Sequence, residues 1–207
     1  MIDLYTWTTP NGRKVSIALE EMDFVYQAHA VDIGKDDQFK PEFLAISPNN
    51  KIPAIVERTT GFHLMESGAI LLWLAEKSGK FLPEADRWQV MEWLMWQMGG
   101  FGPMLGQAHH FLRFKPDVSE YASERYGTEA QRLYSVLDKQ LAGKDFIVGD
   151  YSIVDMAVWP WASRFEWQQI DLNAFPNVRD WYLRIADRPA VQRGYDVPHA
   201  TTDIPRP

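Results

Sequence analysis

The sequence predicts a small α/β domain followed by an all-helical domain. Residues 1–80 contain short strand-like stretches and amphipathic helical periods in the order βαβ, then ββα. From residue 87 to 188 only long helical periods occur, and the segment "GKFLPEADR" separates the two regions. We therefore predict domains at residues 1–80 and 87–197, followed by an extended, polar, proline-containing tail at 198–207.

The first half of the α/β domain is a predicted βαβ unit. Ile2 and Leu4 alternate with other residues, as in a short strand, and "VYQAHAVDI" is predicted to form a second strand. Thr9 offers a helix-capping hydroxyl, and Pro10 suits the first position of a helix. The apolar residues that follow at helical spacing are Val15, Ala18, Leu19 and Met22.

The second half is a predicted hairpin closed by a helix. "IPAIVE" and "GFHLM" are short apolar runs separated by a turn. Ser67 is expected to cap a helix that ends near Gly79. Its expected buried face is Ile70, Leu71 and Leu74. The two halves together predict a mixed four-stranded sheet with helices on both faces.

In the helical domain, local signals mark where helices begin. Asp86 with Gln89 and Ser152 with Asp155 are capping-box patterns, and Ser119 is expected to cap a helix between them. "GGFGP" is expected to bend or break the first of these helices. The face expected to be buried on that first helix is Met91, Leu94, Met95 and Met98.

Composition narrows the functional classes. The chain of 207 residues carries a net charge of -7 and no basic run, which argues against nucleic acid and anionic membranes as partners. There is no apolar stretch of the ~20 residues that a membrane span needs, and no secretory signal is visible, so a cytoplasmic protein is expected. The chain has no cysteine, and the adjacent His109 and His110 cannot chelate one ion well, so no metal is expected.

"TWTTPNGRK", Thr6 to Lys14, is the first candidate site. A helix N-terminus favours an anion and lowers the pKa of a thiol placed there. Thr9 and Asn11 can donate hydrogen bonds to a thiolate sulfur. The alternative interpretation is an ordinary helix cap followed by a turn.

Two further stretches suggest a ligand. A proline at the start of a strand, Pro53 in "NNKIPAI", exposes the backbone of Ile52 if its peptide bond is cis. In "MESGAI", Ser67 can hold a carboxylate and Glu66 can receive an ammonium group. The alternatives are an edge proline and a helix cap with a first-turn acid. Together these stretches predict a site for a small zwitterionic thiol.

Three motifs carry a resemblance to a known family. "NKIPAI", "ESGAILLWLAEK" and "SIVDMA", in this order, resemble cytosolic glutathione transferases over nearly the whole chain. "TPNGRKVSIALEE", "SPNNKIPAI" and "GGFGPMLGQAHHF" look like the Nu class, which includes glutathione-dependent disulfide reductases. The resemblance implies a thioredoxin-like first domain, a homodimer, and a second-substrate site in a cleft between the domains, near residues 101–111.

The resemblance also implies a role for individual residues. Glu66 and Ser67 would hold the γ-glutamyl end of glutathione, and the Ile52 backbone beside a cis Pro53 would pair with its cysteinyl part. The glycyl end is assigned to Gln38 and Lys51, which by themselves are ordinary loop residues. Arg132 matches a position that reaches across a dimer interface, and its alternative interpretation is a solvated helix arginine.

The chain departs from many family members at the catalytic position. Thr9 stands where some classes have a catalytic cysteine, Asn11 follows two residues later, and Tyr5 lies within the predicted strand. Any redox chemistry must therefore use the thiol of glutathione itself. We expect a glutathione-dependent disulfide reductase acting on a small disulfide. The alternatives are conjugation of glutathione to an electrophile and a transferase-like interaction module without turnover.

Overall fold

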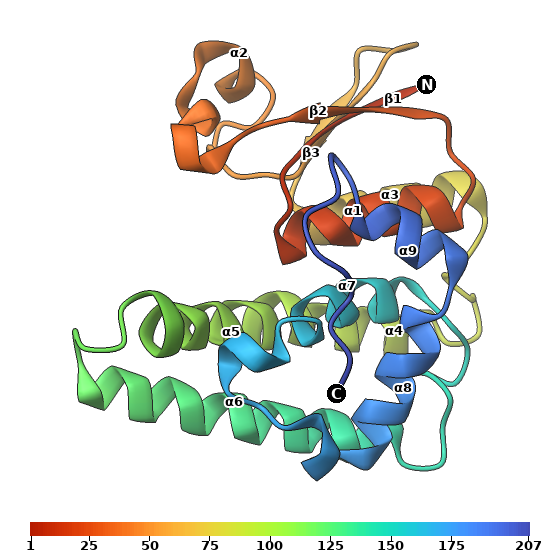
Figure 1. The fold of residues 1–207 in the computed structure, drawn as a ribbon. Coiled ribbons are helices and arrows are strands. Elements are labelled where there is room, and N and C mark those ends of the chain that lie inside the picture. Colours follow the sequence, from red (N-terminus) through yellow and green to blue (C-terminus); the bar gives the residue numbers. More distant parts are fainter. The chain divides into compact units, whose positions relative to one another are not determined.

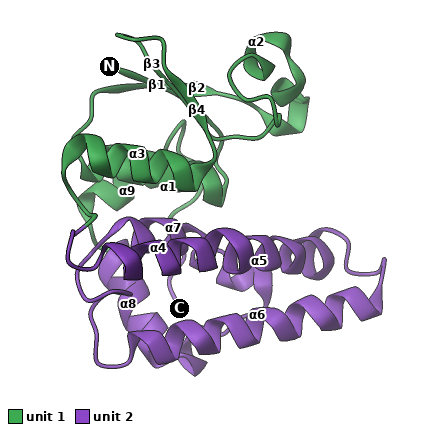
Figure 2. Ribbon diagram, turned by 180° about the vertical axis from the view of Figure 1, so that it is seen from behind, with its two compact units in different colours: residues 1–82, 187–204 green, residues 83–186, 205–207 purple.

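The computed structural model describes residues 1–207, which form two compact units (Figure 2). Unit 1 comprises residues 1–82 and 187–204, and unit 2 comprises residues 83–186 and 205–207. Residues 187–197, which the sequence analysis placed in the helical domain, group with unit 1 because they pack on its first helix.

Unit 1 is built on the mixed four-stranded sheet that the sequence predicts. The strand order is β2-β1-β3-β4, with β1 and β2 parallel and the other neighbours antiparallel. Figure 1 shows α1, α3 and α9 on one side of this sheet. The elements are β1 (Ile2–Thr6), α1 (Pro10–Glu21), β2 (Tyr26–Ala30), η1 (Ile33–Lys35), η2 (Asp37–Phe39), α2 (Pro41–Leu44), β3 (Ala54–Glu57), β4 (His63–Met65), α3 (Ser67–Ser78) and α9 (Pro189–Tyr195).

The core of unit 1 follows the predicted hydrophobic pattern. Ile2 and Leu4 of β1 are buried, whereas Asp3 between them faces the other side of the sheet, as strand alternation requires. The predicted apolar faces of α1 and α3 are buried, and α3 ends at Gly79 with a left-handed residue. The periodicity of apolar residues in the sequence therefore suffices to predict which side chains form the interior of this unit.

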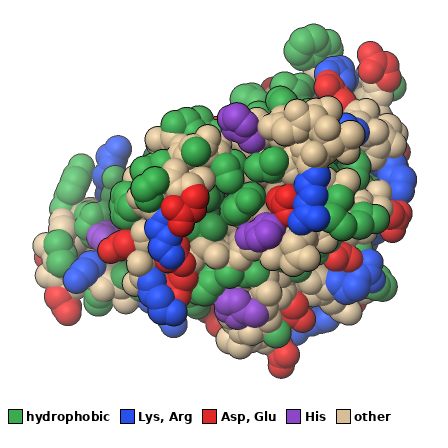
Figure 3. All heavy atoms as spheres, turned by 90° about the horizontal axis from the view of Figure 1, so that it is seen from above, with side chains coloured by type: hydrophobic (Ala, Val, Ile, Leu, Met, Phe, Trp, Pro, Cys, Tyr) green, Lys and Arg blue, Asp and Glu red, His purple; other side chains and the backbone are tan.

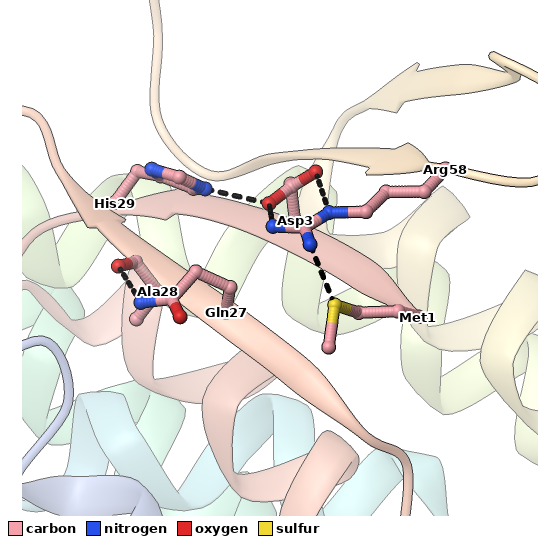
Figure 4. A network of polar contacts seen from close by, with 6 residues as sticks. All are labelled: Met1, Asp3, Gln27, Ala28, His29 and Arg58. Carbon is pink, nitrogen blue, oxygen red and sulfur yellow. Dashed lines mark hydrogen bonds and ion pairs between the residues drawn. The ribbon is translucent and has the colours of Figure 1, made fainter.

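A charged cluster ties β1, β2 and the end of β3 together on the other face of the sheet (Figure 4). Arg58 donates two hydrogen bonds to Asp3, of 2.7 and 2.6 Å, and His29 Nε2 lies 2.6 Å from the same carboxylate. The hydrogen bond from Arg58 is the main reason that the pKa of Asp3 falls to about 2. The cluster therefore fastens three chain segments through one ionised carboxylate.

The predicted cap of α3 was off by one residue. The N-cap is Glu66, whose carbonyl accepts the N–H of Ile70 at 2.9 Å, and Ser67 is the first residue of the helix. Glu66 has φ 70° and ψ 111°, a region that residues with a Cβ rarely occupy. Its side chain makes no capping hydrogen bond, so the hydroxyl-cap rule does not describe this helix start.

The tail has neither helix nor strand, but two of its residues contact residues at or just before the start of α1. Arg13 is buried, donates from Nε to the Tyr195 carbonyl at 3.0 Å, and donates from Nη2 to Thr201 Oγ1 at 3.2 Å. The ring of His199 meets that of Trp7 edge-on at 4.9 Å between centroids. The tail therefore lies beside the loop that leads into α1.

Helices are the only regular elements of unit 2, apart from isolated β-bridges between Phe146 and Gly149 and between Val148 and Asp150. Its helices are α4 (Arg87–Trp96), α5 (Gly102–His109), α6 (Glu120–Leu141), α7 (Ile153–Ala162) and α8 (Pro176–Ala186), with π-helical segments η3 (Gln97–Phe101) and η4 (His110–Phe114) and 3₁₀ turns η5 (Phe165–Gln168) and η6 (Leu172–Ala174). The Ser119 cap and the Ser152–Asp155 capping box are confirmed. No helix of the chain has the length and apolar character to cross a membrane.

Three local predictions for α4 need correction. Asp86 precedes the helix, but its side chain makes no capping hydrogen bond. The buried side is formed by Val90, Leu94 and Gln97, while Met95 is 52% exposed. "GGFGP", which was expected to bend or break the helix, does not break it, because the π-helical segment η3 joins α4 to α5. Apolar residues surround α4, so contact with α7 rather than sequence periodicity selects its buried side.

Charges on the surface are mixed rather than segregated. Lys40 pairs with Asp37 at 2.6 Å, and Lys80 pairs with Asp23 at 3.0 Å. On the face drawn in Figure 3, acidic and basic side chains lie next to one another around a group of hydrophobic side chains. The net charge of -7 therefore does not gather into one patch on this face.

Candidate functional site

Several candidate residues meet at one edge of the unit 1 sheet because of the strand register. Tyr5 of β1 pairs with Ala54 of β3, and Ala54 pairs with Met65 of β4. These paired residues lie at one end of their strands. The same end of the sheet therefore holds the loop after β1, Pro53 just before β3, and Glu66 just after β4. The predicted clustering of Thr9, Pro53 and Glu66 around one sheet edge is what this topology produces.

Thr9 is the N-cap of α1, as predicted. It has extended backbone angles, and its Oγ1 accepts a hydrogen bond from the Gly12 N–H at 3.3 Å. Capping uses a lone pair of the hydroxyl, so its hydrogen stays available to a ligand atom. Pro10 occupies the first turn, and Asn11 is half-buried in that turn. This helix start carries the partial positive charge that favours an anion.

Gly12 is a residue whose importance the sequence analysis missed. A Cβ at this position would lie 2.3 Å from the Trp7 carbonyl oxygen and 2.4 Å from Thr6 Oγ1. Only glycine therefore lets the first turn of α1 pack this closely on the loop that contains Thr9. The signal in the sequence was the "NG" pair, which we used as part of a motif and not as a packing constraint.

The Ile52–Pro53 peptide bond is cis, as the resemblance implied. Pro53 is buried, and Ile52 packs against the cluster of Val31, Phe43 and Ala54. Ser47 Oγ donates to the Lys51 carbonyl at 2.8 Å, while the Lys51 side chain is exposed. The backbone leading into β3 is thus fixed by the packing of Ile52 and by the hydrogen bond from Ser47. The Lys51 amine remains accessible to a ligand.

Gln38 lies in η2 and is half-buried. Its Oε1 is buried and accepts no hydrogen bond, whereas its Nε2 is 3.5 Å from Asp36 Oδ1. A buried acceptor without a donor is uncommon in folded proteins. A ligand N–H would satisfy it, which fits the predicted role of Gln38.

Glu66 and Ser67 form a strained turn with contrasting exposure. The Glu66 side chain is exposed, whereas Ser67 is 3% exposed. A residue with a Cβ at φ 70° and ψ 111° costs about 1–3 kcal/mol, and such conformations cluster at ligand sites. The geometry presents an accessible carboxylate beside a buried hydroxyl at the start of α3.

Lys14 belongs to this site, although the sequence analysis assigned it no role. It is 1% exposed, and its Nζ donates to Ser67 Oγ at 3.4 Å. Burial lowers the pKa of Lys14 to about 7, and the Glu66 carboxylate acts in the opposite direction. The only signal in the sequence was its spacing: Lys14 lies one helical turn before the apolar Ala18.

Arg132 lies in unit 2, on α6, and is exposed. It donates two hydrogen bonds to Glu129, of 2.7 and 2.8 Å, one helical turn away. A groove of about 530 Å³ adjoins Glu129. Its lining residues are Met104, Tyr121, Glu124, Arg125, Tyr126, Thr128 and Glu129. Within the described chain, Arg132 is a surface arginine with an intrahelical partner.

The stretch predicted to meet a second substrate, residues 101–111, is partly core. Phe101, Leu105 and His109 are buried in unit 2, and His109 Nε2 lies 3.1 Å from Gln168 Nε2. Burial, reinforced by two nearby arginines, lowers the pKa of His109 to about 4. His110 is exposed, and no group of three metal-ligating side chains forms anywhere in the chain.

Comparison with known proteins agrees with this architecture. The family model for the glutathione S-transferase N-terminal domain matches residues 4–81, and that for the C-terminal domain matches residues 101–189. The chain is 52% identical to the disulfide-bond oxidoreductase YfcG of Escherichia coli over 198 residues, covering 92% of each chain. It is 42% identical to YghU, another E. coli disulfide-bond oxidoreductase, covering 93% of this chain and 73% of that protein.

Two solved structures of glutathione transferases are similar to this chain in sequence and in fold. A Pseudomonas putida glutathione transferase with one glutathione disulfide per subunit is 43% identical, with a TM-score of 0.91 and coverage of 95% and 91% of the two chains. A Burkholderia graminis glutathione transferase with two glutathione molecules per subunit is 42% identical, with a TM-score of 0.90 and coverage of 95% and 88%. The matches confirm the thioredoxin-like first domain and the helical second domain, and the chain belongs to the glutathione transferase family.

Proposed function

We propose that this protein is a glutathione-dependent disulfide-bond reductase that activates the thiol of bound glutathione without a protein cysteine. The observation that carries the proposal is the capped start of α1, with Thr9 and Asn11, in a chain that contains no cysteine. The names of the E. coli relatives and the glutathione disulfide bound to the P. putida protein support the same chemistry.

In this proposal glutathione lies along the sheet edge. Glu66 takes the ammonium group and Ser67 the carboxylate of the γ-glutamyl end. The Ile52 backbone pairs with the cysteinyl part, and Gln38 and Lys51 hold the glycyl end. This arrangement leaves the thiol at the N-terminus of α1, where Thr9 and Asn11 donate hydrogen bonds to the thiolate.

The reaction then needs two glutathione molecules and no protein thiol. The first thiolate attacks one sulfur of a disulfide RSSR, forming the mixed disulfide GSSR and releasing RS⁻, which takes a proton from water. A second glutathione thiolate attacks GSSR, giving GSSG and a second RS⁻. Two electrons pass from two glutathiones to the substrate, and holding both thiols near the disulfide raises their effective concentration.

We place the second substrate near the exposed part of residues 101–111. The support is local: π-helical segments flank α5 on both sides, and such segments are frequent at functional sites. We also propose a homodimer in which Arg132 releases Glu129 and reaches a partner subunit. Sedimentation equilibrium of the protein and of Arg132→Ala tests this, and a monomeric wild-type protein would exclude it.

The decisive experiment for function is turnover of 2-hydroxyethyl disulfide with glutathione, coupled to glutathione reductase and NADPH. Saturable turnover that falls strongly in Asn11→Ala supports the reductase. Glutathione binding without disulfide turnover, together with conjugation of 1-chloro-2,4-dinitrobenzene, would favour the transferase instead. Absence of both glutathione binding and turnover would favour the third alternative, a transferase-like interaction module without catalysis.

A further inference from the structure

The buried amine of Lys14 lies directly behind the residue proposed to hold the carboxylate of glutathione. Lys14 projects from α1, and its Nζ is 3.4 Å from Ser67 Oγ at the start of α3. Figure 1 shows the two helices side by side, and they are in extensive contact. A lysine almost never becomes this deeply buried unless an opposite charge or a function compensates for it.

We propose that Lys14 is a glutathione-binding residue, whose ammonium group balances the carboxylate of the γ-glutamyl end through Ser67. The inference rests on the proposed position of glutathione and extends it, because neither the sequence motifs nor that proposal gave Lys14 a role. Ser67 would donate its hydroxyl hydrogen to the ligand carboxylate while accepting from Lys14. Such a relay is strengthened by burial, because a hydrogen bond that is charged at one end is stronger away from water.

Within unit 1, several other charged groups on or near α1 are paired with one another. Glu66 is the carboxylate that acts on Lys14, and its side chain is exposed at the site itself. At the far end of α1, Glu20 pairs with Arg193 and Glu21 with Arg188, both from the α9 region. On β1, Asp3 pairs with Arg58 on the opposite side of the sheet, and Lys77 near the end of α3 pairs with Glu57.

A bound carboxylate would also change the protonation of Lys14. With its pKa lowered to about 7, the amine is only partly charged near neutral pH in the free protein. A carboxylate at Ser67 favours the charged form, so binding is coupled to proton uptake. The contribution of the ligand carboxylate to affinity should therefore grow as the pH falls.

The test combines a protein change with a ligand change. Calorimetry would measure binding of S-methylglutathione and of its 4-aminobutyryl analogue, which lacks only the γ-glutamyl carboxylate, to the wild type and to Lys14→Met. S-Methylation removes the thiol and its own proton release from the measurement. Lys80→Met, which removes an exposed lysine of unit 1 that pairs with Asp23, is the matched control.

We expect Lys14→Met to weaken S-methylglutathione binding by about tenfold or more, as for loss of a charged hydrogen-bond partner. The same substitution should change binding of the 4-aminobutyryl analogue by less than about twofold, because the group that Lys14 serves is absent. Equal losses for both ligands, or no loss in a folded Lys14→Met protein, would overturn the inference.

A second measurement needs no variant, in case Lys14→Met fails to fold. In the wild type, the affinity ratio between S-methylglutathione and the analogue should increase as pH falls from about 8.5 to about 6. A constant ratio would overturn the role of Lys14 while leaving the proposed function intact. No binding of S-methylglutathione at any pH would overturn the proposed function together with this inference.

Discussion

Gly194 of α9 rests directly on the backbone of Ile17 in α1. A Cβ on Gly194 would lie 2.6 Å from Ile17 Cα and 2.7 Å from its N, and Ser16 Oγ donates to the Gly194 carbonyl at 2.6 Å. Two helices from opposite ends of the chain therefore meet at backbone distance, beside the stretch of α1 that carries Lys14. This contact explains why residues 187–197 group with the first unit.

Gly194→Ala should consequently destabilise the protein by about 2 kcal/mol or more, since the backbone of α1 cannot move aside as a flexible side chain does. Urea unfolding measures the change. Gly99→Ala is the matched control, because a Cβ there meets nothing within 4 Å. Equal stability of the two variants would show that α9 shifts away at little cost.

Substitution of Thr9 and of Asn11 should affect different quantities, protein stability for Thr9 and the pKa of the bound glutathione thiol for Asn11. Thr9→Ala removes the cap that Gly12 N–H uses and should lower stability by about 1 kcal/mol. Asn11→Ala should raise the pKa of bound glutathione thiol more than Thr9→Ala does, and each pKa unit corresponds to about 1.4 kcal/mol. Ultraviolet absorbance of the thiolate across a pH titration measures this. A larger shift in Thr9→Ala, or equal shifts, would contradict the ranking.

Two substitutions at Glu66 can separate the effect of backbone strain on stability from the effect of the lost carboxylate on glutathione binding. At φ 70°, Glu66→Gly should be more stable than Glu66→Ala by about 1 kcal/mol, because glycine alone occupies this region without strain. Both variants should bind glutathione weakly, since each lacks the carboxylate for the ligand ammonium. Thermal unfolding and calorimetry measure the two effects. Two variants of equal stability would mean that the turn relaxes.

These cases show what the sequence can and cannot predict. The Thr9 cap, the Ser152–Asp155 box and the mixed four-stranded sheet follow from local residue patterns, and the structure confirms them. The α4 prediction was wrong because helix periodicity cannot choose a face when apolar residues surround the helix. Lys14 and Gly194 were missed because their roles come from contacts between segments that are distant in the chain.

Asp155 has a structural role that its capping box only partly reveals. Its carboxylate accepts hydrogen bonds from the backbone N–H of Ile147 and Ser152 and from the indole of Trp181, at 3.1, 2.9 and 2.9 Å. One buried side chain therefore joins α7, α8 and the loop before α7. Near pH 4, Asp155→Asn should cost about 2 kcal/mol or more, because an amide NH₂ cannot accept from these donors.

The same carboxyl group should make stability depend on pH. Burial raises the pKa of Asp155 to about 6, above the value of about 3.9 expected in the unfolded chain. The folded state then binds more protons between these values. The stabilisation that protonation supplies is fully present below about pH 3.9 and is lost as the pH rises through about 6.

The difference in unfolding free energy between the wild type and Asp155→Asn should therefore shrink between about pH 4 and pH 7, because the asparagine does not titrate. Denaturant unfolding across that range measures it, and other titrating groups cancel in the comparison. Leu172→Ala, a buried and non-titrating change in the same unit, should lower stability by the same amount at every pH. A constant difference for Asp155→Asn would show that this carboxyl group keeps one protonation state across the range, so that its buried hydrogen bonds outweigh the cost of burial.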